Sequence, residues 1–244
     1  MATEPDGLSA LEKVEAILAN PAIYELANLI PPPDPKKGGR PRDYPAWTLI
    51  FWEALISVYG SARRVEAELS HRLVWQLIRR TVKRRFPDRP ELHLPARPMR
   101  RHHYLYGRDR YLTDPNVLDA LASRHRQLAT AQARQFGLLD PEGPGSWTHP
   151  DLSRMLYADG KVIAPLFRAK PGDTHVNRTT GEITLRRAEP DAGLHWEGTG
   201  EAAWGTKFVL VAARTTDIRG RIIVDVDWVH HPGAEAATAM GCFE

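Results

Sequence analysis

AWTLIFWEALISVYGSARRVEAELSHRLVWQLIRRTVKRRF, residues 46–86, has the 3.6-residue periodicity of helices almost throughout. Gly60 is typical of a helix end, and Ser61 is suited to cap a second helix. Ser70 is suited to cap a third, which is apolar on one side and basic toward its end. The first helix would bury Trp47, Ile50, Phe51, Ala54, Leu55 and Val58. The pattern predicts a helix-turn-helix-like bundle, or else a helical subdomain whose arginines form a solvated face.

The residues before this bundle divide into a helical arm and a basic linker. Apolar side chains in residues 8–30 are spaced for one or two short amphipathic helices with a break at Asn20 and Pro21, so residues 1–30 read as a packing arm. PPPDPKKGGRPRDYP, residues 31–45, is too rich in proline and glycine for a helix or a central strand. This linker either lies extended along a phosphate backbone or in a minor groove, or is a solvated loop.

After the bundle come a connector and a further helix. Residues 87–110 carry four prolines and mix aromatic with basic side chains, which predicts a loop-rich connector suited to DNA contacts. Residues 111–140 form a predicted bridging helix. Asp114 is a good cap for it, Pro115 fits its first position, and Gly137 closes it.

Positive charge is concentrated in one part of the chain. Residues 36–110 hold 18 Lys and Arg against 7 Asp and Glu, an excess of 11 positive charges, so the rest of this chain of net charge +3 carries −8. Most of these cations are arginines, which bind phosphates and guanine edges in a bidentate way. We therefore assign residues 46–110 as a DNA-binding region with its connector. The candidate DNA-binding side chains are Arg40, Arg42, Arg63, Arg64, Arg79, Arg80, Lys83, Arg84, Arg85, Arg100 and Arg101.

The composition limits which cellular compartment and which cofactors we expect for this protein. Apolar runs fall short of the roughly 18 residues that a membrane span needs, so we expect no membrane partner. The first residues are acidic and contain a proline, unlike a secretory signal. A single cysteine, Cys242, excludes an internal disulfide and a cysteine-rich zinc site. These features predict a cytoplasmic, nucleoid-associated protein.

The second half of the chain, residues 141–244, has the pattern of strands. Apolar runs and turn signals first predict a strand in residues 155–167 with a tight turn at Asp159 and Gly160. A hairpin that turns around Thr180 and Gly181 follows it. Residues 206–215 and 221–229 are then predicted to form an antiparallel pair, and a helix begins in residues 233–240.

Aspartates in these strands are the candidates for chemistry. An Asp-Gly pair is the ordinary way to make a tight turn, so Asp159 by itself reads as a turn residue. Asp225 and Asp227 are two apart and therefore share one face of their strand. Because that strand would lie at a sheet edge, we expect the two aspartates on a solvated face and not in a metal site.

Several segments resemble one family. GRPRDYP, EALISVYGSARRVEAEL, LYADGKVI, AAWGTKFVLVAART and PGAEAATAM are similar to segments of actinobacterial insertion-sequence transposases of the DDE type. The resemblance spans about residues 38–240. It implies an α+β fold in which the helical, helix-turn-helix-like DNA-binding region is followed by an incomplete RNase H-like mixed β-sheet domain.

The resemblance also implies a chemistry. In such enzymes two divalent ions, Mg²⁺ or Mn²⁺, activate the in-line displacement at a phosphate and are held by three carboxylates. The first carboxylate lies in strand one, which gives Asp159 the catalytic and metal-binding role. The second aspartate and the later glutamate have no counterpart in this sequence, so we expect the chain to be truncated before its active site is complete.

Two functions are consistent with this sequence. The first is DNA transposition, in which the chain binds double-stranded DNA at terminal inverted repeats and a completed site cleaves it. The second is a non-catalytic DNA-binding regulator or remnant that pairs with itself or with an intact transposase and represses it. Both predict DNA binding that weakens steeply with salt.

Overall fold

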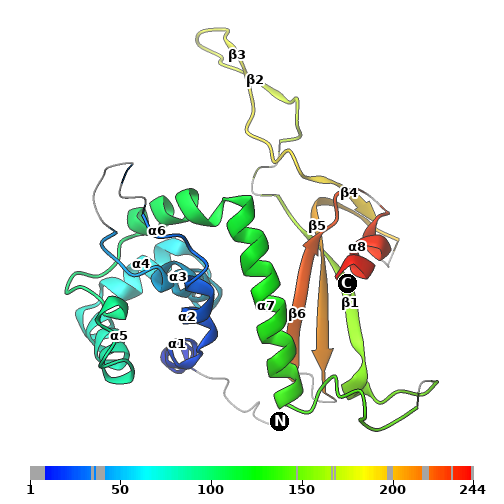
Figure 1. Ribbon diagram of the computed structural model, residues 1–244. Helices are drawn as coiled ribbons and strands as arrows, with labels where there is room; N and C mark the ends of the chain where they lie inside the picture. Colours follow the sequence, from blue (N-terminus) through cyan, green and yellow to red (C-terminus); the bar gives the residue numbers. More distant parts are fainter. Residues whose placement is uncertain are drawn as a thin grey trace, which may run out of the picture. The chain divides into compact units, whose positions relative to one another are not determined.

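The computed structural model describes residues 9–33, 36, 42–146, 148–165, 167, 169–196, 200–215, 220–231 and 233–242. Arg40, one of the predicted DNA-binding residues, lies outside these ranges. The chain folds as α+β, with helices first and antiparallel sheets after them (Figure 1). It divides into two compact units, Met1–His125 and Arg126–Glu244, which we call the helical unit and the sheet unit.

The helices follow the sequence pattern closely. Asn20 and Pro21 separate the first two helices, Gly60 ends α3 with a φ of 81°, and the Ser61 side chain accepts a hydrogen bond from the Arg64 backbone N–H at 3.3 Å. The α-helices are α1 (Ala10–Ala19), α2 (Ala22–Ala27), α3 (Trp47–Tyr59), α4 (Ala62–Ser70), α5 (Arg72–Arg85), α6 (Arg101–Gly107), α7 (Pro115–Gln135) and α8 (Glu235–Gly241). Short 3-10 turns span Pro90–Leu92 and Leu152–Arg154, and a π-turn spans Arg108–Leu112.

Two expectations about the helices were wrong. Ser70 is the last residue of α4, and α5 begins after a one-residue junction, His71, whose side chain makes no cap. The expected loop over residues 87–110 is helical from Arg101 onward. The prolines explain this second difference, since none follows Pro98 before Pro115 and nothing prevents a helix between them.

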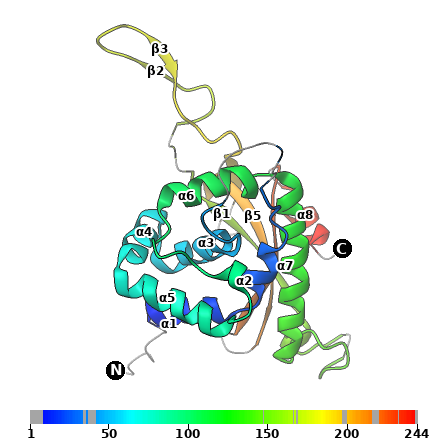
Figure 2. The same ribbon diagram turned by 60° about the vertical axis from the view of Figure 1, so that its left-hand side comes forward.

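The helical unit is built around α3, which is buried on most of its surface (Figure 2). Trp52 and Leu55 are fully buried, and α1, α2, α4 and α6 all contact this helix. The Trp52 ring stacks on Tyr104 of α6 at 5.3 Å, and the Tyr104 hydroxyl donates a 2.6 Å hydrogen bond to Glu53. Burial and the neighbouring Glu53 carboxylate both raise the pKa of Tyr104.

An extended strap, residues 92–98, runs across this bundle and is held by side-chain donors from the helices. Trp47 donates to the Leu92 carbonyl at 3.0 Å, and Trp75 donates to the Pro95 carbonyl at 3.0 Å. Arg79 of α5 donates to the Leu94 carbonyl at 3.1 Å. The strap therefore fixes α5 against α3 without forming regular secondary structure, because its proline content prevents a helix.

The sheet unit contains two antiparallel sheets. Residues that were expected to turn at Asp159 and Gly160 instead form one continuous strand, β1, paired along its whole length with β5. The predicted pairing of residues 206–215 with 221–229 and the predicted turn near Thr180 and Gly181 are both confirmed. The strands are β1 (Leu156–Ile163), β2 (Thr174–Val176), β3 (Ile183–Leu185), β4 (Gly193–Trp196), β5 (Ala202–Arg214) and β6 (Arg221–Trp228).

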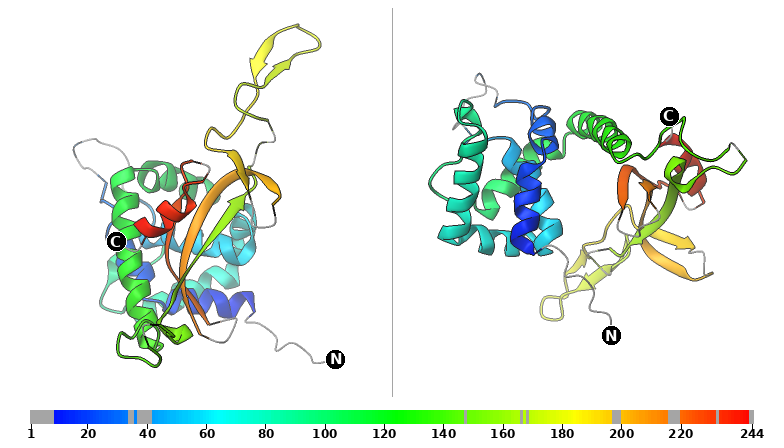
Figure 3. Two further views of the ribbon diagram at one scale, coloured as in Figure 1. Left: turned by 90° about the vertical axis from the view of Figure 1, so that its right-hand side faces the viewer. Right: turned by 90° about the horizontal axis from the view of Figure 1, so that it is seen from below.

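The larger sheet has two unlike faces. Side chains alternate along β5, and every second one, including Val209, Val211 and Ala213, is buried under the second half of α7 and under α8 (Figure 3). We call this the covered face. The strand register assigns to the other, open face the residues Tyr157, Asp159, Lys161, Ile163, Phe208, Leu210, Val226 and Trp228.

The small hairpin formed by β2 and β3 extends away from the larger sheet (Figure 1). Residues 171–187 are all exposed, including the aliphatic side chains of Val176, Ile183 and Leu185. Within the described part of the chain, no helix is both long enough and apolar enough to cross a membrane.

Candidate nucleic-acid interface

Helix α5 presents the most strongly basic surface of the helical unit. Its sequence, RLVWQLIRRTVKRR, contains six cations and no acid. Trp75, Ile78 and Val82 are buried and fix the orientation of the helix. The outward side carries four exposed cations that we call the basic face of α5: Arg72, Arg80, Lys83 and Arg84.

These four cations are not used by the fold. Within the described residues, none of them has a hydrogen bond or an ion pair. Lys83 and Arg84 lie in the last turn, where cations interact favourably with the helix dipole. That explanation does not extend to Arg72 in the first turn or to Arg80 in the middle. The charge of the basic face is therefore available to an anionic partner.

Two of the predicted DNA-binding residues in α5 lie off its outward side: Arg79 serves the fold, and Arg85 is exposed beside Phe86. Arg79 is half-buried and its Nε atom is committed to the Leu94 carbonyl. The Arg85 guanidinium lies 5.6 Å from the centre of the Phe86 ring. The sequence could not separate these two from Arg80 and Arg84, because their positions on α5 only become clear once its buried side is known.

Helix α4 adds two exposed arginines next to α5. Arg63 and Arg64 lie in its first turn, where the helix dipole disfavours cations and where no acidic residue neutralises them. A positive helix end that carries two exposed arginines has the chemistry of a phosphate contact. The bundle brings α4 and α5 together through the junction at His71.

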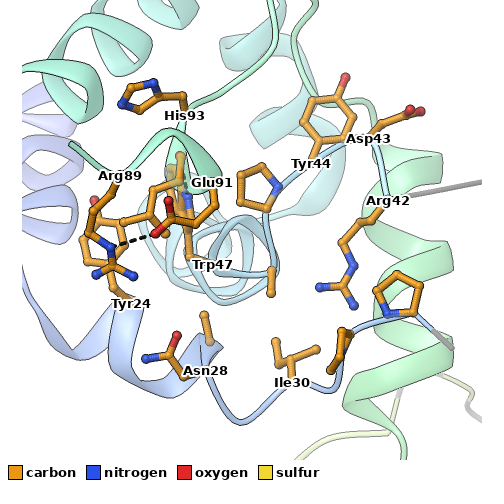
Figure 4. A pocket seen from close by; sticks show the side chains of 16 residues that line it. Tyr24, Asn28, Ile30, Arg42, Asp43, Tyr44, Trp47, Arg89, Glu91 and His93 are labelled. Atoms are coloured by element: carbon orange, nitrogen blue, oxygen red, sulfur yellow. Dashed lines mark hydrogen bonds and ion pairs between the residues drawn. The ribbon is translucent and has the colours of Figure 1, made fainter. Parts of the chain in front are cut away.

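Arg42 was predicted to bind DNA, but its side chain is engaged in packing. It is half-buried, donates to the Pro31 carbonyl at 3.0 Å and lies 4.4 Å from the centre of the Tyr111 ring. Figure 4 shows it at the rim of a pocket of about 500 Å³, in which Arg89 is paired with Glu91 at 2.8 Å. The pocket therefore presents no unpaired cluster of charge, and Arg42 anchors the chain that leads into α3.

A second pocket, of about 700 Å³ and basic, lies at the start of α6. Arg97, Arg100 and His102 line it and are exposed, and Asp43 contributes one acid. Burial raises the pKa of the neighbouring Tyr44, and Arg97 and Arg100 oppose that shift. Arg101, the other prediction here, is half-buried, and its backbone N–H binds Glu66 of α4 at 3.1 Å.

The described residues of the sheet unit do not form a metal site around Asp159. Asp159 is exposed on β1 and lies opposite Leu210 on the open face. Asp225 and Asp227 pair with Val211 and Val209, which places both aspartates on the covered face. Among the described residues, no three His, Cys, Asp or Glu side chains gather closely enough to hold a metal ion. The described residues therefore do not fit a two-ion centre, which needs three converging carboxylates.

The expectation that Asp225 lies on a solvated face was wrong. Its side chain is 5% exposed, and Arg126 of α7 lies 2.7 Å from its carboxylate. Asp227 is exposed as expected. Asp225 is buried because α7 and α8 cover the face of the sheet to which it belongs. A strand at the edge of a sheet can therefore still have one protected face.

Sequence reasoning missed a second ion pair with one buried partner, between Lys207 of β5, which is buried, and Glu235 of α8, which is half-exposed. Lys207 is 7% exposed, and a Cβ atom at position 160 would overlap the Glu235 carboxylate. Gly160 therefore makes room for this pair and has no positive φ. The alternation of Lys207 with apolar residues in β5 was the available signal, since it places a lysine on the buried side.

Comparisons of the chain with models of protein families, with curated proteins and with solved structures found no match.

Proposed function

We propose that this chain is a transposase-like DNA-binding protein whose helical unit binds double-stranded DNA through α4 and α5. The observation that carries the proposal is the basic face of α5, which holds four of the five exposed cations of a helix that has no acid and whose other side is fixed by buried residues. The resemblance of the sequence to insertion-sequence transposases supports duplex DNA, and terminal inverted repeats in particular, as the partner.

The electrostatics support a polyanion over an acidic protein. Arg63 and Arg64 would extend the basic face of α5 by two phosphate contacts. Arginine is well suited to both phosphate and base recognition. An acidic protein would offer single carboxylates at irregular spacing, whereas duplex DNA offers a phosphate about every 1.7 Å of helix axis.

Titration of a fluorescent duplex of about 25 base pairs with the full chain tests the proposal. If six to ten phosphates are contacted, affinity falls by roughly 10³ to 10⁵ between 50 and 200 mM salt. The triple variant Arg80→Ala, Lys83→Ala, Arg84→Ala should bind more weakly and with a salt slope smaller by about 2 to 3.

The matched control removes three exposed cations elsewhere, Lys13, Arg178 and Arg221. The control has the same net charge as the triple variant, so an equal loss of affinity in both would mean that only overall charge matters. No binding to any duplex at 50 mM salt would sink the proposal itself.

Cleavage is the second candidate activity and rests on Asp159. The resemblance gives this residue the role of the first metal ligand, and its position on the open face leaves its carboxylate accessible. The second and third carboxylates would have to come from residues other than those that the structure describes. Binding without catalysis, as in a regulator of transposition, is therefore the function that the described geometry supports better.

The two candidates differ in one assay. A supercoiled plasmid incubated with the chain and Mn²⁺ or Mg²⁺ reports nicking. Asp159→Asn should leave DNA affinity unchanged, because Asp159 lies in the sheet unit and outside the basic face of α5. Metal-dependent nicking by the natural chain that disappears in this variant would establish cleavage in place of simple binding.

A further inference from the structure

The outward side of α5 is not uniformly basic. Leu73, Gln76, Arg80 and Arg84 follow one another at intervals of three, four and four residues, so they form one stripe along the helix. The buried residues Trp75, Ile78 and Val82 form the opposite stripe. Leu73 is 79% exposed, the highest exposure of any large apolar side chain among the described residues.

This composition is not what contact with phosphates alone requires. A leucine gains nothing next to a phosphate, and a glutamine contributes no charge to a phosphate contact. The edges of base pairs in a major groove offer partners for both. A leucine fits against the methyl group of thymine, a glutamine pairs with the N6 and N7 atoms of adenine, and an arginine pairs with the O6 and N7 atoms of guanine.

We infer that α5 is the helix that enters the major groove, and that Leu73, Gln76 and Arg80 read the base sequence while Arg72, Lys83 and Arg84 contact the flanking phosphates. The inference rests on the proposed function and deepens it, because it makes the binding sequence-specific and names the side chains responsible.

The dimensions of the helix agree with this assignment. From Leu73 to Arg84 the stripe is about 16 Å long, at 1.5 Å per residue. A major groove about 12 Å wide accepts one α-helix with its side chains. The outward side of α5 carries no acid that would repel the phosphates beside the groove. Helix α4, with Arg63 and Arg64 at its exposed end, is suited to contact the backbone beside it.

Selection from a pool of randomised duplexes, followed by sequencing of the bound fraction, tests the inference. The full chain should enrich one short sequence. Leu73→Ala, Gln76→Ala and Arg80→Ala should each lose discrimination by about 5- to 100-fold at one or two positions of that sequence, and keep it at the others. Since Leu73 and Gln76 are uncharged, their variants should keep the affinity for unselected DNA within about twofold.

The double variant Lys83→Ala, Arg84→Ala is the matched contrast. It should weaken binding to all duplexes alike, reduce the salt slope by about 2 and preserve the enriched sequence. Circular dichroism of each variant checks that α5 stays folded, and all the substituted side chains lie at the surface or are half-buried.

The outcomes separate the inference from the proposed function. If the chain binds no duplex, the proposed function fails. If it binds duplexes but enriches no sequence, or if the enriched sequence is unchanged in the Leu73, Gln76 and Arg80 variants, DNA binding stands and the reading role of α5 is overturned. A loss of all affinity only in Leu73→Ala, with normal folding, would overturn the division into reading and phosphate-contacting residues.

Discussion

In the helical unit the exposed charges lie outside a complete core, whereas in the sheet unit charged side chains are part of the packing. The basic face of α5 makes no contact that the fold needs, and the apolar residues beneath it are fully enclosed. In the sheet unit, Asp225 pairs with Arg126 and Lys207 pairs with Glu235 beneath α7 and α8.

This difference separates binding from stability. Removing a charge from the basic face of α5 should alter what the protein binds and leave its folding unchanged. Removing a buried charge from the covered face should lower the free energy of unfolding, because the site loses its ion pair and its packing and the half-exposed partner loses its counter-charge.

Asp225→Ala should destabilise the sheet unit by about 2–4 kcal/mol. Asp225 is 5% exposed, but Arg126 is 42% exposed and regains some hydration, which keeps the loss below that of a fully buried pair. Urea denaturation followed by circular dichroism measures it. Asp227→Ala is the control two residues away, and its exposed carboxylate should change stability by no more than about 0.5 kcal/mol. Equal effects of the two substitutions would contradict a buried role for Asp225.

The sequence predicts the features that depend on neighbouring residues and misses those that depend on residues far apart in the chain. Gly60 and Ser61 end one helix and start the next, and Asp114, Pro115 and Gly137 bound α7, all as expected. These are local signals, in which a side chain or a φ angle acts on its own backbone within four residues. The antiparallel pairing of β5 with β6 was also predictable, since a short loop leaves few alternatives.

The failures concern contacts between residues far apart in the chain. Asp159 and Gly160 read as a turn because the reason for the glycine, the Glu235 carboxylate, lies 75 positions later in the sequence. The covered position of Asp225 depends on where α7 and α8 pack, which periodicity does not encode. For the same reason the predicted set of arginines in α5 included Arg79, whose partner is a carbonyl of the strap.

Two glycines provide the second test, one from each unit. A Cβ atom on Gly107 would lie 2.5 Å from a methyl group of Leu49, which is 3% exposed and has no room to move. On Gly160 it would meet the ends of two long side chains. Glu235 is 43% exposed and able to turn outward if it leaves Lys207, whose Cε atom would lie 2.7 Å from the new Cβ. Gly107→Ala should therefore cost about 2–3 kcal/mol and Gly160→Ala about 1–2 kcal/mol.

Thermal unfolding of the two variants, beside the natural chain, gives the comparison. Combining Gly160→Ala with Glu235→Ala removes the contact with the Glu235 carboxylate and leaves only the one with Lys207, so the double variant should lose less stability than the sum of its single variants. A larger loss for Gly160→Ala than for Gly107→Ala would mean that the sheet unit is the more rigidly packed of the two.

Neighbouring arginines in α5 form the third test, because one belongs to the fold and the other to the basic face. Arg79→Ala leaves the Leu94 carbonyl without its donor and should cost about 1 kcal/mol, while DNA affinity changes little. Arg80→Ala should change stability by no more than about 0.5 kcal/mol and weaken DNA binding. Denaturation and duplex titration on the same two samples provide both readouts, and matching profiles for the two variants would remove the distinction.

The smallest effect concerns the start of α1, where an exposed charge of the helical unit does serve the fold. Glu12 accepts a hydrogen bond from the Ser9 backbone N–H at 2.7 Å, and the Ser9 side chain accepts one from the Glu12 N–H at 3.3 Å. The contacts with the Ser9 side chain and backbone lower the pKa of Glu12 below its ordinary value. A lowered pKa in the folded state means that the stabilisation is present above the unfolded-state pKa and is lost as the pH falls through the folded-state pKa.

Titration of the Glu12 carboxyl by NMR should therefore give a midpoint below that of an ordinary glutamate, and α1 should lose helicity over the same range of acidic pH. Ser9→Ala removes the side-chain contact and should move the midpoint back toward the ordinary value. A Glu12 midpoint that is the same with and without the Ser9 hydroxyl would assign the shift to the backbone N–H. The exposed charges of the helical unit would then contribute to folding only through backbone contacts, which would sharpen the contrast with the ion pairs between side chains in the sheet unit.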